Sequence, residues 1–241
     1  MKQLLVTISA SQPLAPNLDL LTLVAPELPP LRAGQLLLAR WPGRYDPYVR
    51  AAHFAIPSAE SCLIIVNKGE HKARPYEVGD VLDVLAPVGK GFRLEASTRR
   101  LLLAGDEWSL APLLALANEA TQKQVAVTLL IQQSSSVGRF YEALLPLDVE
   151  FQVAPQWDIS AELLDWCDQV CVAGPRSAYV QLKERIGQSA VVHTAGFAQA
   201  VVVPAMPCGF GACLGCAVET TRGLKLACVE GPVFDLMELV V

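Results

Sequence analysis

The spacing of hydrophobic positions changes twice along this chain, and each change predicts a different kind of structure. Up to about residue 97, short apolar runs lie between turns rich in proline and glycine, and no helical period appears among them. This pattern is typical of a small antiparallel β-barrel, which we expect over residues 1–97. The predicted strands cover residues 4–9, 18–24, 35–41, 52–56, 62–67 and 81–86.

From Arg99 onward, short buried strands alternate with helical segments. Such alternation predicts an α/β domain with a doubly wound parallel sheet, here over residues 98–195, and leaves residues 196–241 as a small C-terminal module. Ser109 is expected to cap the first helix. The expected strands cover residues 101–104, 125–131, 149–153, 170–173 and 190–193, and the expected helices cover residues 109–122, 138–145, 161–167 and 174–186.

Composition and charge exclude several classes of partner. Hydrophobic residues make up 52% of the 241 residues and charged residues 18%, which is apolar for a soluble protein and indicates buried interfaces with other subunits. The net charge is −5 and no Lys/Arg cluster appears, so nucleic acid and anionic membranes are poor partners. The N-terminus resembles a strand more than a signal peptide, and the apolar run 110–117 is too short to cross a bilayer. We therefore expect a cytoplasmic protein.

The chemistry of the chain is concentrated in its C-terminal module, which holds four of the seven cysteines. Cys208, Cys213 and Cys216 are spaced C-x4-C-x2-C, and Cys228 follows after eleven residues. The first three match the plant-type spacing of a [2Fe-2S] cluster, which needs four thiolates converging on a small volume. Glycines between the cysteines allow the backbone to curl around such a cluster and to bring amide N–H groups near its sulfurs.

Two other uses of the same thiols stay open at this point. Four cysteines can also hold a structural zinc ion, although zinc sites usually take their ligands as two separated pairs, whereas three of these cysteines lie within nine residues. A disulfide framework is the other alternative, and it fits poorly with a reducing compartment. The spacing therefore favours the iron–sulfur cluster, and we expect Cys62, Cys167 and Cys171 to be buried apolar side chains.

The order of the parts and three segments of the sequence resemble one known family. Segments 208–218 and 227–235 are similar to its cluster signature, and segment 83–92 is similar to its turn between the barrel and the second domain. The family is the electron-transfer subunit of the two-subunit, NAD-linked bacterial dihydroorotate dehydrogenase of pyrimidine biosynthesis, within the ferredoxin-reductase superfamily. The resemblance implies that the barrel binds FAD, that the α/β domain binds NAD(H), and that the cluster relays electrons to a flavin in a partner subunit.

The flavin loop of this chain departs from the family pattern, in which an arginine and a serine are separated by two residues. Aligned on Phe54, the arginine position holds Ala52 and the serine position holds Ala55. Because the phosphates of FAD need cationic or N–H partners, neighbouring cationic side chains would have to replace the arginine. The FAD-binding residues that the resemblance implies are therefore Arg50, His53, Phe54, Ala55, Lys68 and Gly69.

The nicotinamide loop, residues 105–112, departs further from the family pattern. Asp106 and Glu107 place negative charge where a phosphate would lie, and Trp108 fills space that the family's glycines leave open. The family's later Cys-Gly-Pro is Ala-Gly-Pro at residues 173–175. These departures argue against binding of NAD(H).

The favoured interpretation is an electron-transfer subunit that carries a [2Fe-2S] cluster and acts in complex with a catalytic, dihydroorotate dehydrogenase-like oxidoreductase. The four cysteines would be ligands, and the sequence offers no Ser/His/Asp or Cys/His arrangement for catalysis. Two alternatives stay open. One is a non-catalytic assembly or regulatory subunit that has lost nucleotide binding, and the other is a self-contained NAD(P)H oxidoreductase.

Overall fold

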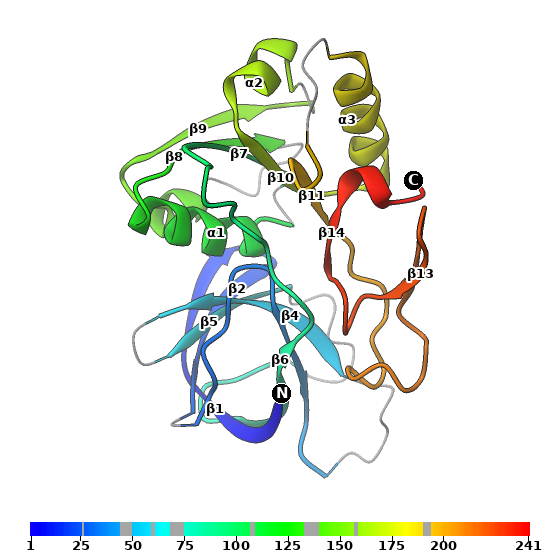
Figure 1. Ribbon diagram of the computed structural model, residues 1–241. Helices are drawn as coiled ribbons and strands as arrows, with labels where there is room; N and C mark the ends of the chain where they lie inside the picture. Colours follow the sequence, from blue (N-terminus) through cyan, green and yellow to red (C-terminus); the bar gives the residue numbers. More distant parts are fainter. Residues whose placement is uncertain are drawn as a thin grey trace.

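The computed structural model describes residues 1–25, 27–43, 50–58, 61–67, 75–106, 109–132, 140–156, 159–189 and 194–241. Within these residues the chain forms a closed barrel, a six-stranded sheet flanked by helices, and a C-terminal hairpin (Figure 1). The predicted fold class, a barrel followed by a parallel-sheet domain and a C-terminal module, is confirmed.

The barrel contains the six strands that the apolar pattern predicts, and each strand pairs antiparallel with its neighbours in the order β1-β2-β5-β4-β3-β6. Alternate side chains point inward, so that Val6, Ile8, Leu21 and Leu23 are fully buried in the barrel core. The first strand is longer than expected. The strands are β1 (Lys2–Ala15), β2 (Leu18–Val24), β3 (Leu36–Arg40), β4 (Ala51–Pro57), β5 (Cys62–Asn67) and β6 (Val81–Val88).

The second part of the chain forms a sheet in the order β14-β11-β10-β7-β8-β9, in which only the β11–β14 pair is antiparallel. Its helices are α1 (Ala111–Gln122), α2 (Ala161–Trp166) and α3 (Arg176–Gln188), with a short 3-10 helix η1 (Phe140–Leu144). Its strands are β7 (Arg100–Asp106), β8 (Ala126–Gln132), β9 (Val149–Ala154), β10 (Gln169–Ala173), β11 (Ala198–Val201) and β14 (Val233–Asp235).

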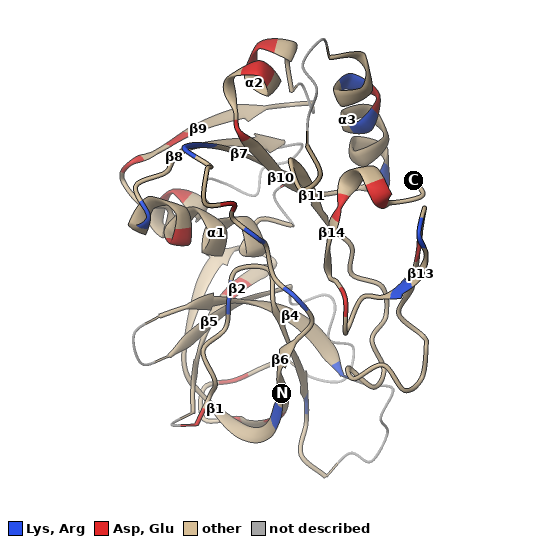
Figure 2. Cartoon of the chain, in the orientation of Figure 1, with Lys and Arg blue, Asp and Glu red and all other residues tan. Residues whose placement is uncertain are grey.

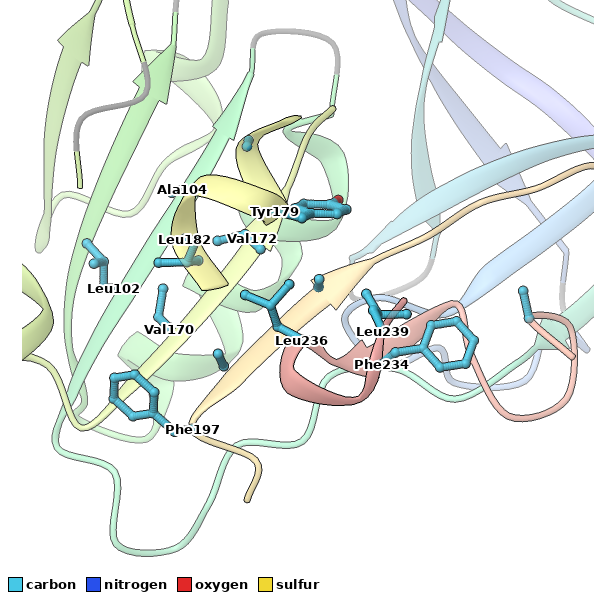
Figure 3. Packing of buried hydrophobic residues seen from close by; sticks show 14 of the residues in the cluster. Leu102, Ala104, Val170, Val172, Tyr179, Leu182, Phe197, Phe234, Leu236 and Leu239 are labelled. Carbon is cyan, nitrogen blue, oxygen red and sulfur yellow. The ribbon is translucent and has the colours of Figure 1, made fainter. Parts of the chain in front are cut away.

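The two faces of this sheet form two separate cores. Leu101 and Leu103 of β7 pack in the core that contains α1, which lies between the sheet and the barrel (Figure 1). Leu102 and Ala104 pack in the other core, together with Tyr179 and other residues of α3 (Figure 3). A parallel strand that is covered on both faces must be apolar at nearly every position, which explains the continuous run in β7.

Two details of this domain differ from expectation. The α1 helix begins after Leu110, not after Ser109, and the cap residue makes no side-chain hydrogen bond to the helix. A proline in the first turn suits that start, because its missing N–H has no partner in a helix at this position. The strand expected at 190–193 lies outside the described residues, and the strand that pairs with β10 is β11.

The C-terminal module is joined to the sheet. Its hairpin, β12 (Ala217–Thr220) and β13 (Gly223–Leu226), turns at residues 221–222, close to the predicted excursion. After it, β14 adds to the sheet edge, and Leu236 and Leu239 around the short 3-10 helix η2 (Leu236–Glu238) pack in the core beside α3 (Figure 3). The domain limits 1–97, 98–195 and 196–241 stay a prediction.

Across the described ranges, no helix has both the length and the apolar character needed to cross a membrane.

A buried ion-pair network lies at one side of the barrel. The Asp83 carboxylate on β6 accepts hydrogen bonds from Arg40 Nε at 2.6 Å and from Gln3 Nε2 at 2.9 Å, and its Oδ2 lies 3.5 Å from Arg50 Nη2. The Arg50 side chain is only 8% exposed. Burial lowers the pKa of Arg50 from its usual value, and the charge of Asp83 opposes that shift. Each buried charge in this network therefore depends on its partner.

We expect Asp83→Asn to lower the free energy of unfolding by about 3 to 5 kcal/mol, because it leaves the buried Arg50 guanidinium without its counter-charge. The measurement is urea-induced unfolding. The control is Glu119→Gln, which removes an exposed ion pair with Lys123 on α1 and should cost about 0.3 to 0.5 kcal/mol. Equal losses in the two variants would show that the Asp83 network does not stabilise the barrel.

Candidate iron–sulfur site and the cavity between the domains

The first three cysteines lie on the loop between β11 and β12, which packs against the barrel. Gly209 on this loop has φ of +77°, and a Cβ built there would lie 2.5 Å from Leu38 Cδ1 and 2.9 Å from Leu85 Cδ2. Only glycine adopts this backbone conformation at low cost while leaving room for the two leucines. The loop is therefore held close to the barrel at the residue that follows Cys208.

The four thiols are arranged as two neighbouring pairs. Cys216 and Cys228 are buried, and their Sγ atoms are 3.2 Å apart. Cys208 is half-buried, Cys213 is exposed, and their thiols are also within hydrogen-bonding reach. A tetrahedral metal with sulfur bonds of about 2.3 Å holds two sulfur ligands about 3.8 Å apart, so the Cys216 and Cys228 sulfurs lie somewhat closer together than two ligands on one metal.

Backbone N–H groups of this loop and of Cys228, which follows the hairpin, point at the sulfur atoms. Gly215 donates to Cys213 Sγ at 3.5 Å, and the N–H of Cys228 approaches Cys216 Sγ at 3.5 Å. At Cys208, burial alone would raise the pKa, but hydrogen bonds from the N–H groups of Phe210 and Cys213 outweigh it and lower the pKa to about 6. These donors favour the thiolate, which is the form that binds a metal.

Cys228 differs from Cys208 in the direction of its pKa shift. Burial, followed by the hydrogen bond and charge of Cys216, raises the pKa of Cys228 to about 12. A bound cation between these sulfurs would reverse that tendency, since metal coordination removes the thiol proton. The donor set therefore fits a group that offers one positive centre to each pair of sulfurs.

This arrangement fits a two-iron cluster better than a single ion. Each iron of a [2Fe-2S] cluster takes two of the four cysteines, whereas one zinc ion would require all four sulfurs around one point. None of the seven cysteines, all of which are described, forms a disulfide.

The remaining cysteines are interior residues, as expected. Cys62, Cys167 and Cys171 are all buried. Burial raises the pKa of Cys62 and of Cys167 to about 12 each, and it raises that of Cys171 further. These thiols stay protonated at neutral pH and pack as small apolar side chains.

A cavity of about 380 Å³ lies between the barrel and the sheet. Phe54 of β4 and Asn67 of β5 line one side, and Pro112 and Gly174 line the other, at the carboxyl ends of β7 and β10. The chain leaves β7 toward β8 on one side and returns through β10 on the other, so this edge is the switch point where open α/β sheets bind ligands. Residues such as Asn67 and Val201 carry no motif, and only the folding of distant segments brings them together.

The structure separates the residues that the resemblance implies for FAD. Phe54 and His53 both line the cavity, although His53 is largely buried and its Nε2 lies 3.4 Å from the Tyr76 hydroxyl. Ala55 is fully buried and does not line it. Arg50 is paired with Asp83, so binding a phosphate would require that ion pair to open. Lys68 and Gly69 lie outside the described residues, as do Glu107 and Trp108 of the nicotinamide loop. The assignment of these residues to FAD stays a prediction.

The barrel, the doubly wound sheet and the cysteine loop define a ferredoxin-reductase-like protein. The chain is similar to the structure of the NADH-dependent reduced ferredoxin-NADP oxidoreductase, with a TM-score of 0.77, 19% identity, and coverage of 99% of this chain and 90% of the other. It is also similar to phthalate dioxygenase reductase, with a TM-score of 0.63, 17% identity, and coverage of 82% and 68%. At these identities the likeness concerns the fold.

The C-terminal module carries the more specific relationship. Residues 204–240 match the model of the iron–sulfur cluster binding domain of dihydroorotate dehydrogenase B. Relatives described as the electron transfer subunit of dihydroorotate dehydrogenase B (NAD(+)) include one from a Geobacillus species, 27% identical over 100% of this chain and 99% of its own length. Another, from Caldanaerobacter subterraneus, is 30% identical over 70% of each chain. The chain belongs to this family of electron transfer subunits.

We expect Gly209→Ala to lower the free energy of unfolding by about 2 to 4 kcal/mol, because the new Cβ combines an unfavourable φ with overlap against Leu38 and Leu85. Gly223 is the matched control, since it also has positive φ but has no atom within 4 Å of its Cβ position. Gly223→Ala should cost only about 1 to 2 kcal/mol. Chemical denaturation measures both, and a Gly209→Ala protein no less stable than the control would contradict the close packing of the loop.

Proposed function

We propose that this chain relays electrons between a flavin and a catalytic partner subunit through a [2Fe-2S] cluster held by Cys208, Cys213, Cys216 and Cys228. The observation that carries the proposal is that the cysteine loop and Cys228, which follows the hairpin, bring thiols together with backbone N–H groups pointing at sulfur. Family membership and the matched cluster-binding domain support it. When bound, such a cluster supplies a centre that accepts and releases single electrons.

The protein contributes ligand position and electrostatics. In the proposed arrangement Cys208 and Cys213 bind one iron, and Cys216 and Cys228 bind the other. N–H donors such as Gly215 stabilise the negative charge on the sulfurs, and burial of the inner pair excludes water, so both features tune the reduction potential. The outer pair is nearer to the surface, which suits electron exchange with another protein.

The cavity between barrel and sheet is the proposed position of the flavin ring. Phe54 offers an aromatic surface there, and Val203, which also lines the cavity, precedes Cys208 by only five residues. Five residues span at most about 18 Å, so a ring in the cavity and the cysteine loop are necessarily close. The fold supports FAD as the flavin, and the groups that hold its phosphates are left open.

The surface around the cysteine loop is the proposed docking site of the partner. Phe210 and Leu214 on the loop and Val229 beside Gly211 are 57%, 64% and 44% exposed, and Leu224 on the following hairpin is 73% exposed, which is unusual for large apolar side chains. Residues 202–218 contain no charged side chain, and Figure 2 shows this loop free of blue and red. An uncharged, apolar surface suits a permanent hetero-oligomer with a dihydroorotate dehydrogenase-like subunit.

The seven cysteines form no disulfide, which agrees with a cytoplasmic location.

Protein purified without air should contain about two iron atoms and about two acid-labile sulfides per chain, with a visible absorbance that dithionite bleaches. Cys208→Ser and Cys228→Ser should each abolish most of this absorbance, because each removes one of four ligands. Cys62→Ala is the control and should keep the spectrum, since Cys62 is buried inside the barrel. A colourless preparation containing zinc would overturn the proposal.

We expect Leu224→Glu to weaken binding of the catalytic subunit by at least about tenfold, because it places a charge in the proposed apolar interface. The matched control is Leu147→Glu, at a fully exposed position in the turn before β9. Affinity is measured by titrating one purified subunit with the other. Unchanged binding by Leu224→Glu would place the partner on a different surface.

A further inference from the structure

The carboxyl edge of β7 and β10 is where a doubly wound sheet normally receives the phosphates of a dinucleotide. The reasons are general: the edge is a topological switch point, and backbone N–H groups at the start of the following helix attract negative charge. In this chain the edge borders the 380 Å³ cavity, and α1 begins there. Whether a phosphate can bind therefore depends on which N–H groups and which charges this edge presents.

On the β7 side, a side-chain carboxylate of the protein accepts a hydrogen bond from a backbone N–H group. Asp106 is the last residue of β7, and its Oδ1 accepts a hydrogen bond from the Ser109 N–H at 2.8 Å, while its carbonyl oxygen accepts from the same group at 3.1 Å. Further along, Pro112 has no N–H, and the N–H groups of Leu113 and Leu114 both donate to the Leu110 carbonyl at 2.9 Å. The carboxylate thus accepts the N–H group of Ser109 just before the N-terminus of α1, an end of the helix that favours a negative charge.

On the β10 side, the backbone N–H is also already bonded. Gly174 donates to the Tyr179 hydroxyl at 3.0 Å, and that hydroxyl donates to the Val201 carbonyl at 2.6 Å. Burial, together with the nearby charge of Asp106, raises the pKa of Tyr179 to about 12, so the hydroxyl keeps its proton at neutral pH.

We propose that Asp106 is a specificity-determining residue whose carboxylate occupies the phosphate position at the switch point and excludes NAD(H) and NADP(H) from this chain. Two unit charges about 5 Å apart, at an effective dielectric of about 20, repel strongly enough to weaken affinity by about 100-fold. Direct hydride exchange with a nicotinamide dinucleotide is then excluded, although several relatives carry NAD(+) in their names. The role of Asp106 concerns the end of β7, whereas the cluster would lie on the C-terminal module. This role does not require the cluster to be present.

The test is direct binding of NADH, NADPH and ADP-ribose to the purified chain with its bound cofactors, measured by titration calorimetry. The wild-type chain should bind each of them with a Kd weaker than about 1 mM. Asp106→Asn keeps an acceptor for the Ser109 N–H but removes the charge, and it should bind at least about tenfold more tightly. Asp148→Asn removes the same charge from an exposed turn before β9 and should leave binding unchanged.

Micromolar binding of NADH by the wild-type chain, or reduction of its flavin by NADH, would overturn the proposal. So would a folded Asp106→Asn protein that binds no better than Asp148→Asn, with folding checked by circular dichroism. The visible absorbance of the cluster is recorded on the same samples. Its absence would count against the proposed electron relay, whereas the dinucleotide affinities decide the role of Asp106.

Discussion

Close backbone contact between the C-terminal module and the barrel is the constraint on which the geometry of the thiols depends. The Lys90 N–H donates to the Gly231 carbonyl, and Lys90 also pairs with Pro232 as an isolated bridge. At the other end of the module, Gly209 lies against Leu38 with no room for a Cβ. The segment that carries the cysteines is thus tied to the barrel on both sides, and β14 ties it to the sheet as well. A loop held at several points keeps its sulfurs in place without depending on the metal alone.

Two kinds of group that could bind the phosphates of a dinucleotide, a cationic side chain and backbone N–H groups, are bonded to other groups of the protein. The cation nearest to the expected flavin loop, Arg50, is neutralised by Asp83 inside the barrel. The N–H groups at the switch point are bonded to Asp106 and to the Tyr179 hydroxyl. Buried or half-buried polar groups must find partners, and in this chain the partners come from the protein. Under the proposal for Asp106, the fold of the family is present while this edge no longer offers free N–H groups at Ser109 and Gly174.

Much of the architecture could be predicted because it rests on local patterns. Short apolar runs between proline- and glycine-rich turns identified the barrel strands, and the alternation of buried strands such as β7 with helical segments identified the α/β domain. The spacing of Cys208, Cys213 and Cys216 pointed to a cluster before any tertiary contact was known. Less could be said where a strand has no strong pattern, as with β11, which is four residues long and lies close to the predicted limit of the third module.

The sequence by itself determined the order of the parts, the alternation of strands and helices, and the set of four thiols, because these depend on neighbours along the chain. Only the tertiary structure decided that Cys216 and Cys228 form a pair, since one precedes β12, the other follows β13, and the pairing of these strands brings them together at the open end of the hairpin. It also decided that Arg50 forms an ion pair with Asp83, which is 33 residues away along the chain. Such pairings are set by which segments the packing brings together, and no spacing within one segment reveals them.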